Sequence, residues 1–492
     1  MTPNFSDLVE EARLSLQALV DYGDQLFNPT VRLGVTGLSR AGKTVFITAL
    51  IHGLLRGGRF PVFEAFATGR IARARLAPQP DDAVPRFAYE SHVRTLVEER
   101  QWPHSTVDIS ELRLVIDYQR PNGADRTLTL DIVDYPGEWL LDLPLLAKSY
   151  QQWSAESLNL SRAGPRAPLA AAWHAHLTTL DPLGRADEQA TLTAAKLFTD
   201  YLRACRDERF AMSLLPPGRF LMPGGLAGSP ALTFAPLDVP AGGAAPDGSL
   251  WAMMARRYEA YKDVVVRPFF RDHFARLDRQ IVLVDTLAAF NAGPEALHDL
   301  QGALAGILDC FRVGRRTFFA SMLRPRIDRI LFAATKADHL HHASHDRLEA
   351  ILQRMVERAV KQAEFAGAEV DVVALAAVRA TREVRLRRGH EQLPAIVGTP
   401  LAGEVANGEP FDGATEVATF PGDLPAQPDA LFSEPADSGP FKGLSHGTAD
   451  QADYRFLRFR PPQLDNSGGD TPYLPHIRLD RALQFLIGDR LT

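Results

Sequence analysis

Apolar stretches alternate with amphipathic ones along this chain and predict a layered α/β protein. Apolar segments of strand length are separated by segments whose apolar residues recur at helical spacing. The apolar centre of the segment at 280–284 is typical of a parallel central strand, because such strands are covered on both faces. Strands of the core are expected at 31–35, 128–133, 280–284, 330–334 and 370–375.

One pair of strands departs from this pattern. Apolar residues largely alternate over 109–118, a Pro121-Asn122-Gly123 turn follows, and the apolar segment at 128–133 comes next. Two strands joined across an Asn-Gly turn form an antiparallel hairpin. We therefore expect one strand of the sheet to run against the others.

Pattern and composition divide the chain into four parts. The first part opens with an amphipathic helix over 5–26, and the last contains an edge strand over 454–459 and a closing helix over 477–487. Between the two groups of strands expected for one sheet domain, helical stretches alternate with Pro- and Gly-rich loops and predict an insertion. We expect the first half of this domain at 1–144, the mostly helical insertion at 145–278 and the second half at 279–395. A C-terminal extension follows at 396–492.

Composition narrows the class of protein. The 492 residues are 46% hydrophobic and 23% charged, with a net charge of −6, which argues against a dedicated nucleic-acid binder. Cys205 and Cys310 form no paired motif and predict reduced thiols in the cytoplasm. The first residues lack the basic and apolar regions of a signal peptide, and no window approaches 18 apolar residues, so no transmembrane segment is expected. A peripheral membrane role stays open.

The turn after the strand at 31–35 matches the pattern G-x-x-x-x-G-K-[ST] and leads into a helix. Glycine lacks a Cβ, so the backbone can curl around phosphate with its N–H groups turned inward, and the helix N-terminus adds further donors. In such loops the lysine reaches the β- and γ-phosphates and the last hydroxyl binds Mg²⁺. The expected nucleotide-binding residues here are Gly37, Ser39, Arg40, Ala41, Gly42, Lys43 and Thr44.

A second motif, D-x-x-G, ends the hairpin at Asp134 and Gly137. In G proteins the aspartate reaches Mg²⁺ through water and the glycine N–H contacts the γ-phosphate. The motif also occurs in ordinary turns after strands, but its place behind a phosphate loop and a hairpin favours the functional interpretation.

A third motif, T-K-x-D, follows the strand at 330–334 and comprises Thr335, Lys336 and Asp338. A carboxylate here can accept hydrogen bonds from guanine N1–H and its exocyclic amine, which adenine does not offer. The alternative is a charged loop without a binding role. Ala377 and Val378 follow the last core strand, where G proteins contact the guanine oxygen, and are candidates by position alone.

Four histidines follow this third motif, and such clusters suit metal ions. Because their spacing is that of a loop entering a helix, with no cysteine and no closed ligand set, we favour solvated polar side chains over a metal site. The residues are His339, His341, His342 and His345.

The motifs GLSRAGKT, WPHST, DIVDYPGEWLLDLPLL, AATKADHL and PHIRLDRALQFL together resemble the YcjX stress-protein family of bacteria. The resemblance covers nearly the whole chain. It implies an α/β fold of the Ras-like phosphate-loop NTPase type, with one antiparallel strand, a large mostly helical insertion and a C-terminal extension. It also implies a Mg²⁺-dependent cytoplasmic GTP-binding protein linked to phage-shock, heat and envelope stress. Such a protein would work at the inner membrane, beside a membrane-anchored or activating partner.

Carried onto matching positions, the resemblance implies roles for several residues. The phosphate loop holds the phosphates and Mg²⁺, Thr106 is the first-switch threonine that closes on Mg²⁺, and Asp134 and Gly137 form the second switch. The base loop holds guanine. The expected metal ligands are therefore Thr44, Thr106 and Asp134, and the expected catalytic residues are Lys43, Thr106, Gly137 and Glu138.

Two departures from the Ras-like pattern affect the expected rate. Glu138 stands where a water-orienting glutamine is usual, and a carboxylate cannot donate a hydrogen bond to the γ-phosphate. His104 stands where Gα subunits carry a built-in arginine. We therefore expect slow hydrolysis of GTP to GDP, helped by an arginine from Arg100, the insertion or a partner. The alternative is a nucleotide-stabilised scaffold without significant turnover, and an ATP-using enzyme comes third.

Overall fold

The structure is a computed structural model. It describes residues 29–38, 40–104, 106–240, 242–309, 327–365, 367–388, 391–406, 408–432, 456–464 and 472–492. The helix expected over 5–26, Ser39 and Cys310 lie outside the described residues.

Seven strands of the described chain form the central sheet, in the order β2-β3-β4-β1-β5-β6-β7. β3 runs antiparallel to β2 and β4, and the other neighbouring pairs are parallel. The predicted hairpin is confirmed as β3 and β4, and with it the α/β class. The strands are β1 (Thr30–Gly37), β2 (Ile71–Ala77), β3 (Ser110–Gln119), β4 (Asp125–Asp134), β5 (Arg279–Val284), β6 (Arg329–Ala334) and β7 (Glu369–Ala374).

The register brings the functional motifs to one edge of the sheet. Val35 pairs with Asp134, and Gly37 pairs with Leu283, so β1, β4 and β5 end together. β6 and β7 end beside them, with Ala334 opposite Val284 of β5 and Ala374 of β7. The loops that follow these parallel strands therefore meet at their carboxyl ends, where α/β sheets bind ligands.

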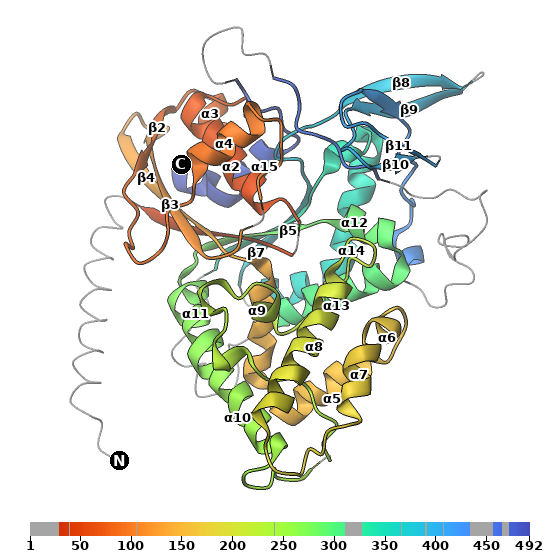
Figure 1. Ribbon diagram of the computed structural model, residues 1–492. Coiled ribbons are helices and arrows are strands. Elements are labelled where there is room, and N and C mark those ends of the chain that lie inside the picture. The colour runs from red at the N-terminus through yellow and green to blue at the C-terminus, as the bar shows by residue number, and fades with distance from the viewer. Residues whose placement is uncertain are drawn as a thin grey trace, which may run out of the picture.

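Two hydrophobic layers cover the sheet, and alternation along the strands assigns side chains to them. In β5, Ile281 and Leu283 pack in one layer, and Val282 and Val284 pack in the other. α2, α3, α4 and α15 lie on the first face (Figure 1). These helices are α2 (Lys43–Arg56), α3 (Glu64–Ala67), α4 (Tyr89–Val97) and α15 (Leu479–Ile487).

The second face is covered by helices that follow β5 and β6 and by the helices between β4 and β5. The former are α12 (Thr286–Ala292), α13 (Pro294–Asp309) and α14 (His345–Phe365). Of the latter, the longer ones are η1 (Gly137–Ala147), α5 (Tyr150–Ser161), α8 (Glu188–Arg206) and α10 (Leu250–Tyr261). The shorter ones include α6 (Arg166–Leu169), α7 (Ala171–Leu177), α9 (Gly218–Leu221), a π-turn at Lys262–Val266 and α11 (Arg267–Asp272).

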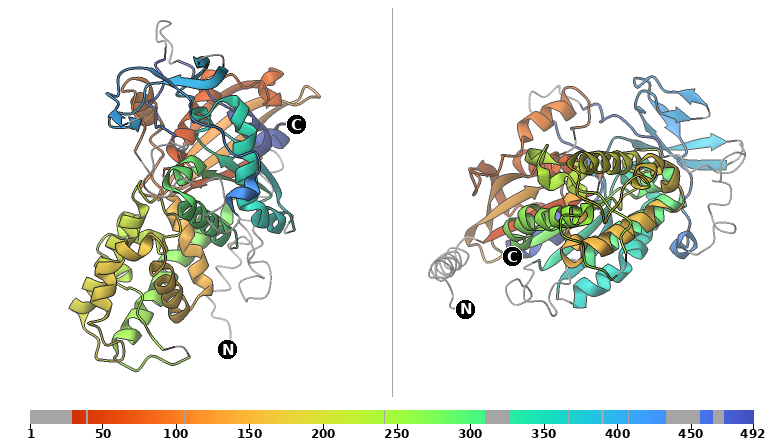
Figure 2. Two further views of the ribbon diagram at one scale, coloured as in Figure 1. Left: turned by 90° about the vertical axis from the view of Figure 1, so that its right-hand side faces the viewer. Right: turned by 60° about the horizontal axis from the view of Figure 1, so that its bottom comes forward.

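Most of the helices between β4 and β5, among them α5, α7, α8 and α10, extend away from the sheet as a helical lobe (Figures 1 and 2). Their interior is aromatic: the ring of Trp153 stacks on Tyr258 with centroids 5.2 Å apart and meets Phe198 and Phe234 edge-on. A buried ion pair, Arg166 to Asp299 at 2.5 Å, joins this lobe to α13. Because both charges are buried, loss of one partner would leave the other uncompensated.

Sequence reasoning missed β2, α3 and α4, and one expected strand was wrong. In the predicted edge strand at 454–459, the described residues 456–459 form only an isolated bridge, from Phe459 to Pro400. Backbone pairing here is limited to the residues around that bridge, where the Leu401 N–H donates to the Arg458 carbonyl. Other backbone groups of the segment are bound by side chains: Asn291 pairs with Phe456, and the Trp102 indole donates to the carbonyl of Phe459.

Further short strands lie outside the main sheet. β8 (Arg382–Arg388), β9 (Glu391–Gly398) and β12 (Val417–Thr419) form one small antiparallel sheet, and β10 (Val405–Ala406) and β11 (Glu409–Pro410) form another. Among the helices that the structure describes, none combines the length and the apolar character needed to cross a bilayer.

Candidate functional site

The phosphate loop leaves β1 at Gly37 and enters α2 at Lys43, and both of its motif glycines have a steric reason. A Cβ on Gly37 would lie 2.6 Å from the carbonyl oxygen of Leu283, so the loop passes too close to β5 for a side chain. Gly42 has φ +85°, the left-handed conformation that glycine adopts without strain. Arg40, at φ 63°, also adopts a left-handed conformation. The resulting loop curls over the N-terminus of α2.

Lys43 is buried, and its ammonium group is turned back over the loop. Its Nζ donates to the carbonyl oxygen of Gly37 at 2.9 Å. The charge therefore lies inside the curve formed by the loop backbone, beside the free N–H groups of the first turn of α2. A concave arrangement of N–H donors with a cation at its centre suits phosphate oxygens.

Three oxygen-bearing side chains meet next to the lysine, from α2, from the segment before β3 and from the end of β4. The hydroxyl of Thr106 donates to Asp134 Oδ2 at 2.6 Å and lies 3.3 Å from the Thr44 hydroxyl. Asp134 Oδ1 is buried without a hydrogen-bond partner among the described residues. Burial raises the pKa of Asp134 to about 6, although Lys43 opposes this change. Hydroxyl and carboxylate oxygens with one free buried acceptor fit a hard cation such as Mg²⁺.

Gly137 lies against the phosphate loop. A Cβ at this position would come within 1.9 Å of the Gly37 carbonyl oxygen, so a larger residue cannot occupy it in this arrangement. Glu138 is buried and forms an ion pair with Arg206 of α8, with 3.7 Å between Oε1 and Nη1. Its side chain is thus held by the helical lobe, at the edge of the phosphate loop.

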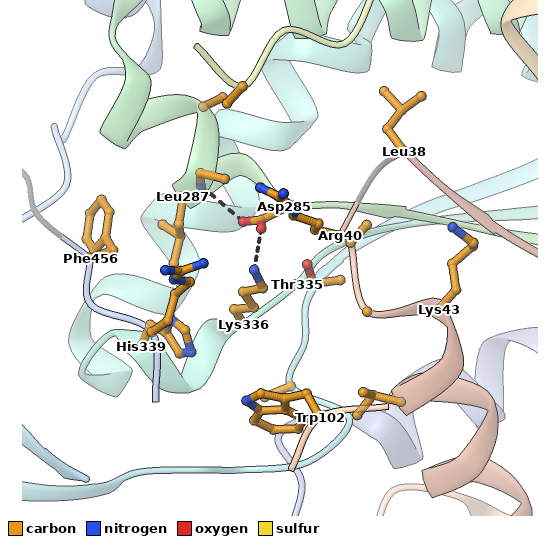
Figure 3. A pocket seen from close by; sticks show the side chains of 18 of the residues that line it. Leu38, Arg40, Lys43, Trp102, Asp285, Leu287, Thr335, Lys336, His339 and Phe456 are labelled. Atoms are coloured by element: carbon orange, nitrogen blue, oxygen red, sulfur yellow. Dashed lines mark hydrogen bonds and ion pairs between the residues drawn. The ribbon is translucent and has the colours of Figure 1, made fainter. Parts of the chain in front are cut away.

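A cavity of about 500 Å³ extends from the phosphate loop to the loops after β6 and β7. Figure 3 shows Lys43 and Lys336 on different sides of it, with the Trp102 indole below them in this view. Of the predicted residues, those lining the cavity are Arg40, Ala41, Gly42, Lys43, Thr44, Thr106, Thr335, Lys336, Asp338, Ala377 and Val378. Gly37, Asp134, Gly137 and Glu138 are buried behind its wall.

The T-K-x-D residues after β6 are fixed by hydrogen bonds with the neighbouring loops. Lys336 has φ 60° and its Nζ lies 2.5 Å from Asp285 Oδ2, the pair marked by a dashed line in Figure 3. Asp338 is 4% exposed, and its Oδ2 accepts the N–H of Ala380 at 2.8 Å. The Thr381 hydroxyl donates to the Asp338 carbonyl oxygen. The Asp338 carboxylate is therefore oriented from behind while facing the cavity.

Several lining residues were missed from the sequence. Trp102 precedes Thr106 in the chain and donates its indole N–H to the carbonyl oxygen of Phe459 at 2.7 Å. Asp285 directly follows β5, a position at which a carboxylate could have been noted. Others come from the helical lobe and the C-terminal segment and carry no motif; they include Arg206, Glu208, Met212, Phe456, Arg458 and Phe459.

The histidine cluster divides into two pairs. His339 and His345 are buried, contrary to the expectation of solvated side chains: His339 lies edge-on to Phe459, and His345 Nε2 bonds to the carbonyl of Ala337 at 2.8 Å. Burial lowers the pKa of both. His341 and His342 lie outside the cavity beside Glu383, and the His342 Nδ1 is 2.6 Å from that carboxylate.

Cations surround the phosphate-loop end of the cavity. Burial and the positive charges of Arg206 and Arg458 lower the pKa of Arg40. Glu208 partly balances them, with 2.8 Å to Arg40 and 2.5 Å to Arg458. An anion entering this end would meet Lys43 and an arginine cluster whose charges repel one another, so its binding would be favoured electrostatically.

The sheet order, the loop from β1 to α2 and the meeting of the motifs at the strand ends define a phosphate-loop α/β protein of the Ras-like type. The YcjX-like family, DUF463, matches residues 31–491, and the chain belongs to this family, as the motifs predicted. The Ras-like GTPase YcjX of Escherichia coli strain K12 is 39% identical over 97% of this chain and 98% of its own length. The Ras-like GTPase YcjX of Shewanella oneidensis is 33% identical over 97% of this chain and 99% of its own length.

Proposed function

We propose that this protein binds GTP and hydrolyses it to GDP with Mg²⁺, as a stress-response switch whose turnover is slow without a partner. One observation carries the proposal: a single cavity joins the phosphate loop to Asp338, beside the cluster of Thr44, Thr106 and Asp134. The relatives named Ras-like GTPases support the same choice of nucleotide.

The proposed roles follow from position. Lys43 and the loop N–H groups bind the β- and γ-phosphates, and the Gly137 N–H faces the γ-phosphate. Thr44, Thr106 and Asp134 hold Mg²⁺, which neutralises phosphate charge when bound. Asp338 and the backbone at Ala377 and Val378 recognise guanine, and the stem of Lys336 lies along its ring.

The switch would act through the loops around Thr106 and Gly137. Both touch the phosphate loop, so a γ-phosphate that gains contacts with them would order them, and hydrolysis would release them. The division into a split G domain, the insertion at 145–278 and the extension at 396–492 is part of this proposal. The proposal also includes a cytoplasmic location, with a peripheral place at the inner membrane. It includes a membrane or activating protein as partner and no role for nucleic acid.

A nucleotide-stabilised scaffold is the second candidate, and Glu138 is the observation that favours it. Its carboxylate is paired with Arg206 and does not line the cavity, so it is not placed to orient an attacking water molecule. A protein of this kind would bind GTP or GDP and hold a partner on its helical lobe without turnover.

Equilibrium binding tests the nucleotide assignment common to both candidates. The purified full-length chain is first loaded with fluorescent GDP and Mg²⁺. Unlabelled GTP, GDP and ATP are then added, and their ability to displace the probe is measured. We expect GTP and GDP to displace the probe at least about 100-fold better than ATP, because only guanine satisfies Asp338. Lys43→Ala should abolish binding. Equal competition by ATP would contradict a guanine site.

A further inference from the structure

Arg206 is the last residue of α8 and reaches the nucleotide cavity from the helical lobe. It lines the cavity together with Arg40, Lys43 and Thr44. Its side chain is 30% exposed, which leaves the guanidinium accessible to a bound molecule. An arginine from a distant segment thus lies at the phosphate-loop end of the site.

The contacts of Arg206 are loose. Its Nη1 lies 3.7 Å from Glu138 Oε1 and 3.3 Å from the thioether sulfur of Met222, a weak acceptor. Close arginine–carboxylate hydrogen bonds measure about 2.7–2.9 Å, so the pair with Glu138 is an ion pair without a tight hydrogen bond. A phosphate oxygen could compete for this guanidinium.

The ion pair with Glu138 sets the position of the Arg206 guanidinium. Glu138 follows Gly137, which packs directly on the Gly37 carbonyl, and the Lys43 ammonium binds that same carbonyl. The γ-phosphate of a bound nucleotide lies against Lys43 in phosphate-loop proteins. Glu138 therefore holds Arg206 beside the group that would be transferred.

The other arginines near the site either form shorter ion pairs than Arg206 or lie away from the cavity. Arg40 and Arg458 each pair closely with Glu208, and Arg458 also pairs with Glu404 at 2.6 Å. Arg100 binds the carbonyl of Pro461, away from the cavity lining. Arg206 is the arginine of the described cavity lining whose carboxylate contact is longest.

We propose that Arg206 is a catalytic residue that leaves Glu138 for the phosphates of bound GTP and stabilises the transition state of hydrolysis. Glu138, which occupies the position of the usual glutamine, is then a positioning residue that binds Arg206 until nucleotide is present. This inference rests on the proposed function, and it places the arginine in the insertion of the same chain.

The reaction balances without a further reagent. A water oxygen bonds to the γ-phosphorus while the bond from that phosphorus to the β–γ bridging oxygen breaks. The electron pair of the broken bond stays on the β-phosphate, giving GDP, and the water proton passes to the released phosphate. Arg206 would donate N–H groups to the bridging and γ-oxygens, where negative charge grows.

Arg206→Ala tests this role, and Arg203→Ala is the matched control. Arg203 lies one turn earlier on α8, is exposed, pairs with Asp200 and does not line the cavity. Three quantities are measured for each full-length variant: GDP affinity, single-turnover GTP hydrolysis, and binding of Mg²⁺·GDP with aluminium fluoride, which mimics the transferred phosphoryl group. If the alanine variant does not fold, Arg206→Lys, which keeps the positive charge on a long side chain, replaces it.

We expect Arg206→Ala and Arg206→Lys to hydrolyse GTP at least about 50-fold more slowly and to lose the aluminium fluoride complex, with GDP affinity within about threefold of wild type. Arg203→Ala should match wild type in all three measurements. Glu138→Ala should accelerate hydrolysis only while Arg206 is present.

Different results would contradict the GTPase function and the role of Arg206. If the Arg206 variants hydrolyse GTP and bind aluminium fluoride like wild type, the role of Arg206 is wrong and the GTPase assignment stands. If wild type binds GDP but neither hydrolyses GTP nor accepts aluminium fluoride, the hydrolytic function and the role of Arg206 are both wrong.

Discussion

At the scale of single residues, the proposed selectivity for guanine depends on the buried carboxylate of Asp338. One of its oxygens accepts the Ala380 N–H, and the side chain is held at the wall of the cavity with little exposure. A base that offers two donors would satisfy the remaining acceptor capacity. A base without them would leave a buried charge unpaired, which costs more than the hydrogen bond itself gains.

Asp338→Asn is therefore expected to weaken the preference for guanine. The amide places an N–H₂ donor where a carboxylate accepted, so GTP should lose roughly 100-fold in affinity while ATP changes little. Competition against a fluorescent nucleotide measures both. Asp346→Asn, at an exposed position near by, is the control. An unchanged ratio of GTP to ATP affinity would overturn the base assignment.

The sequence could predict residues whose role depends on short spacing. The phosphate-loop residues and the T-K-x-D residues would each act within a single loop, so their spacing in the chain is enough to place them together. Arg206, Trp102 and Phe459 reach the same cavity from three distant segments. No spacing rule relates such residues, and only the packing of the lobe and the C-terminal segment brings them together.

At the scale of elements, η1 (Gly137–Ala147) connects Gly137, the glycine of the proposed second switch, to the helical lobe. The Asp142 carboxylate accepts the Gly218 N–H at 2.7 Å and the Tyr261 hydroxyl at 2.6 Å, so one residue of η1 joins α9 and α10. A movement that starts at Gly137 would be transmitted to the lobe through this contact.

The same carboxylate gives a pH dependence. Burial raises the pKa of Asp142 to about 6 from 3.8, so the folded protein binds this proton more tightly than the unfolded chain. The resulting stabilisation is complete below pH 3.8 and is lost as pH rises through about 6. The amide of the Asp142→Asn variant cannot titrate, so the free energy of unfolding of this variant relative to wild type should improve between pH 5 and pH 8.

Urea unfolding of the two proteins at both pH values measures that difference, with Asp238→Asn as an exposed control. A stability difference that is the same at pH 5 and pH 8 would contradict the raised pKa of Asp142.

Element prediction succeeded where strands are buried and failed where they are not. The core strands are apolar because both faces are covered, and the Asn-Gly turn marked the hairpin of β3 and β4. β2, with the sequence IARARLA, is half exposed at the edge of the sheet and consists mostly of alanine and arginine, so it lacks the run of large apolar residues that marked the core strands. At 456–459 the alternating pattern is real, but backbone pairing with residues 399–401 is limited to one short bridge. Side chains of Asn291 and Trp102 bind the backbone of Phe456 and Phe459.

At the scale of the whole molecule, the phosphate loop, the helical lobe and the C-terminal segment enclose one cavity. Arg458 of the C-terminal segment pairs with Glu208 of the lobe, and Glu208 pairs with Arg40 of the phosphate loop. A nucleotide that draws Arg40 or Arg206 toward its phosphates would therefore alter contacts in all three parts. This arrangement provides a physical route from nucleotide state to the surface of the lobe.

Phosphate release from purified full-length protein with Mg²⁺·GTP tests the central claim most directly, beside Thr44→Ala and an ATP control. We predict slow, GTP-specific release, on the order of 10⁻⁴ to 10⁻² s⁻¹, that falls at least about tenfold in Thr44→Ala because a Mg²⁺ ligand is lost. Tight GTP binding with no phosphate release would contradict the GTPase and leave the scaffold. Equal release from ATP would contradict the guanine site.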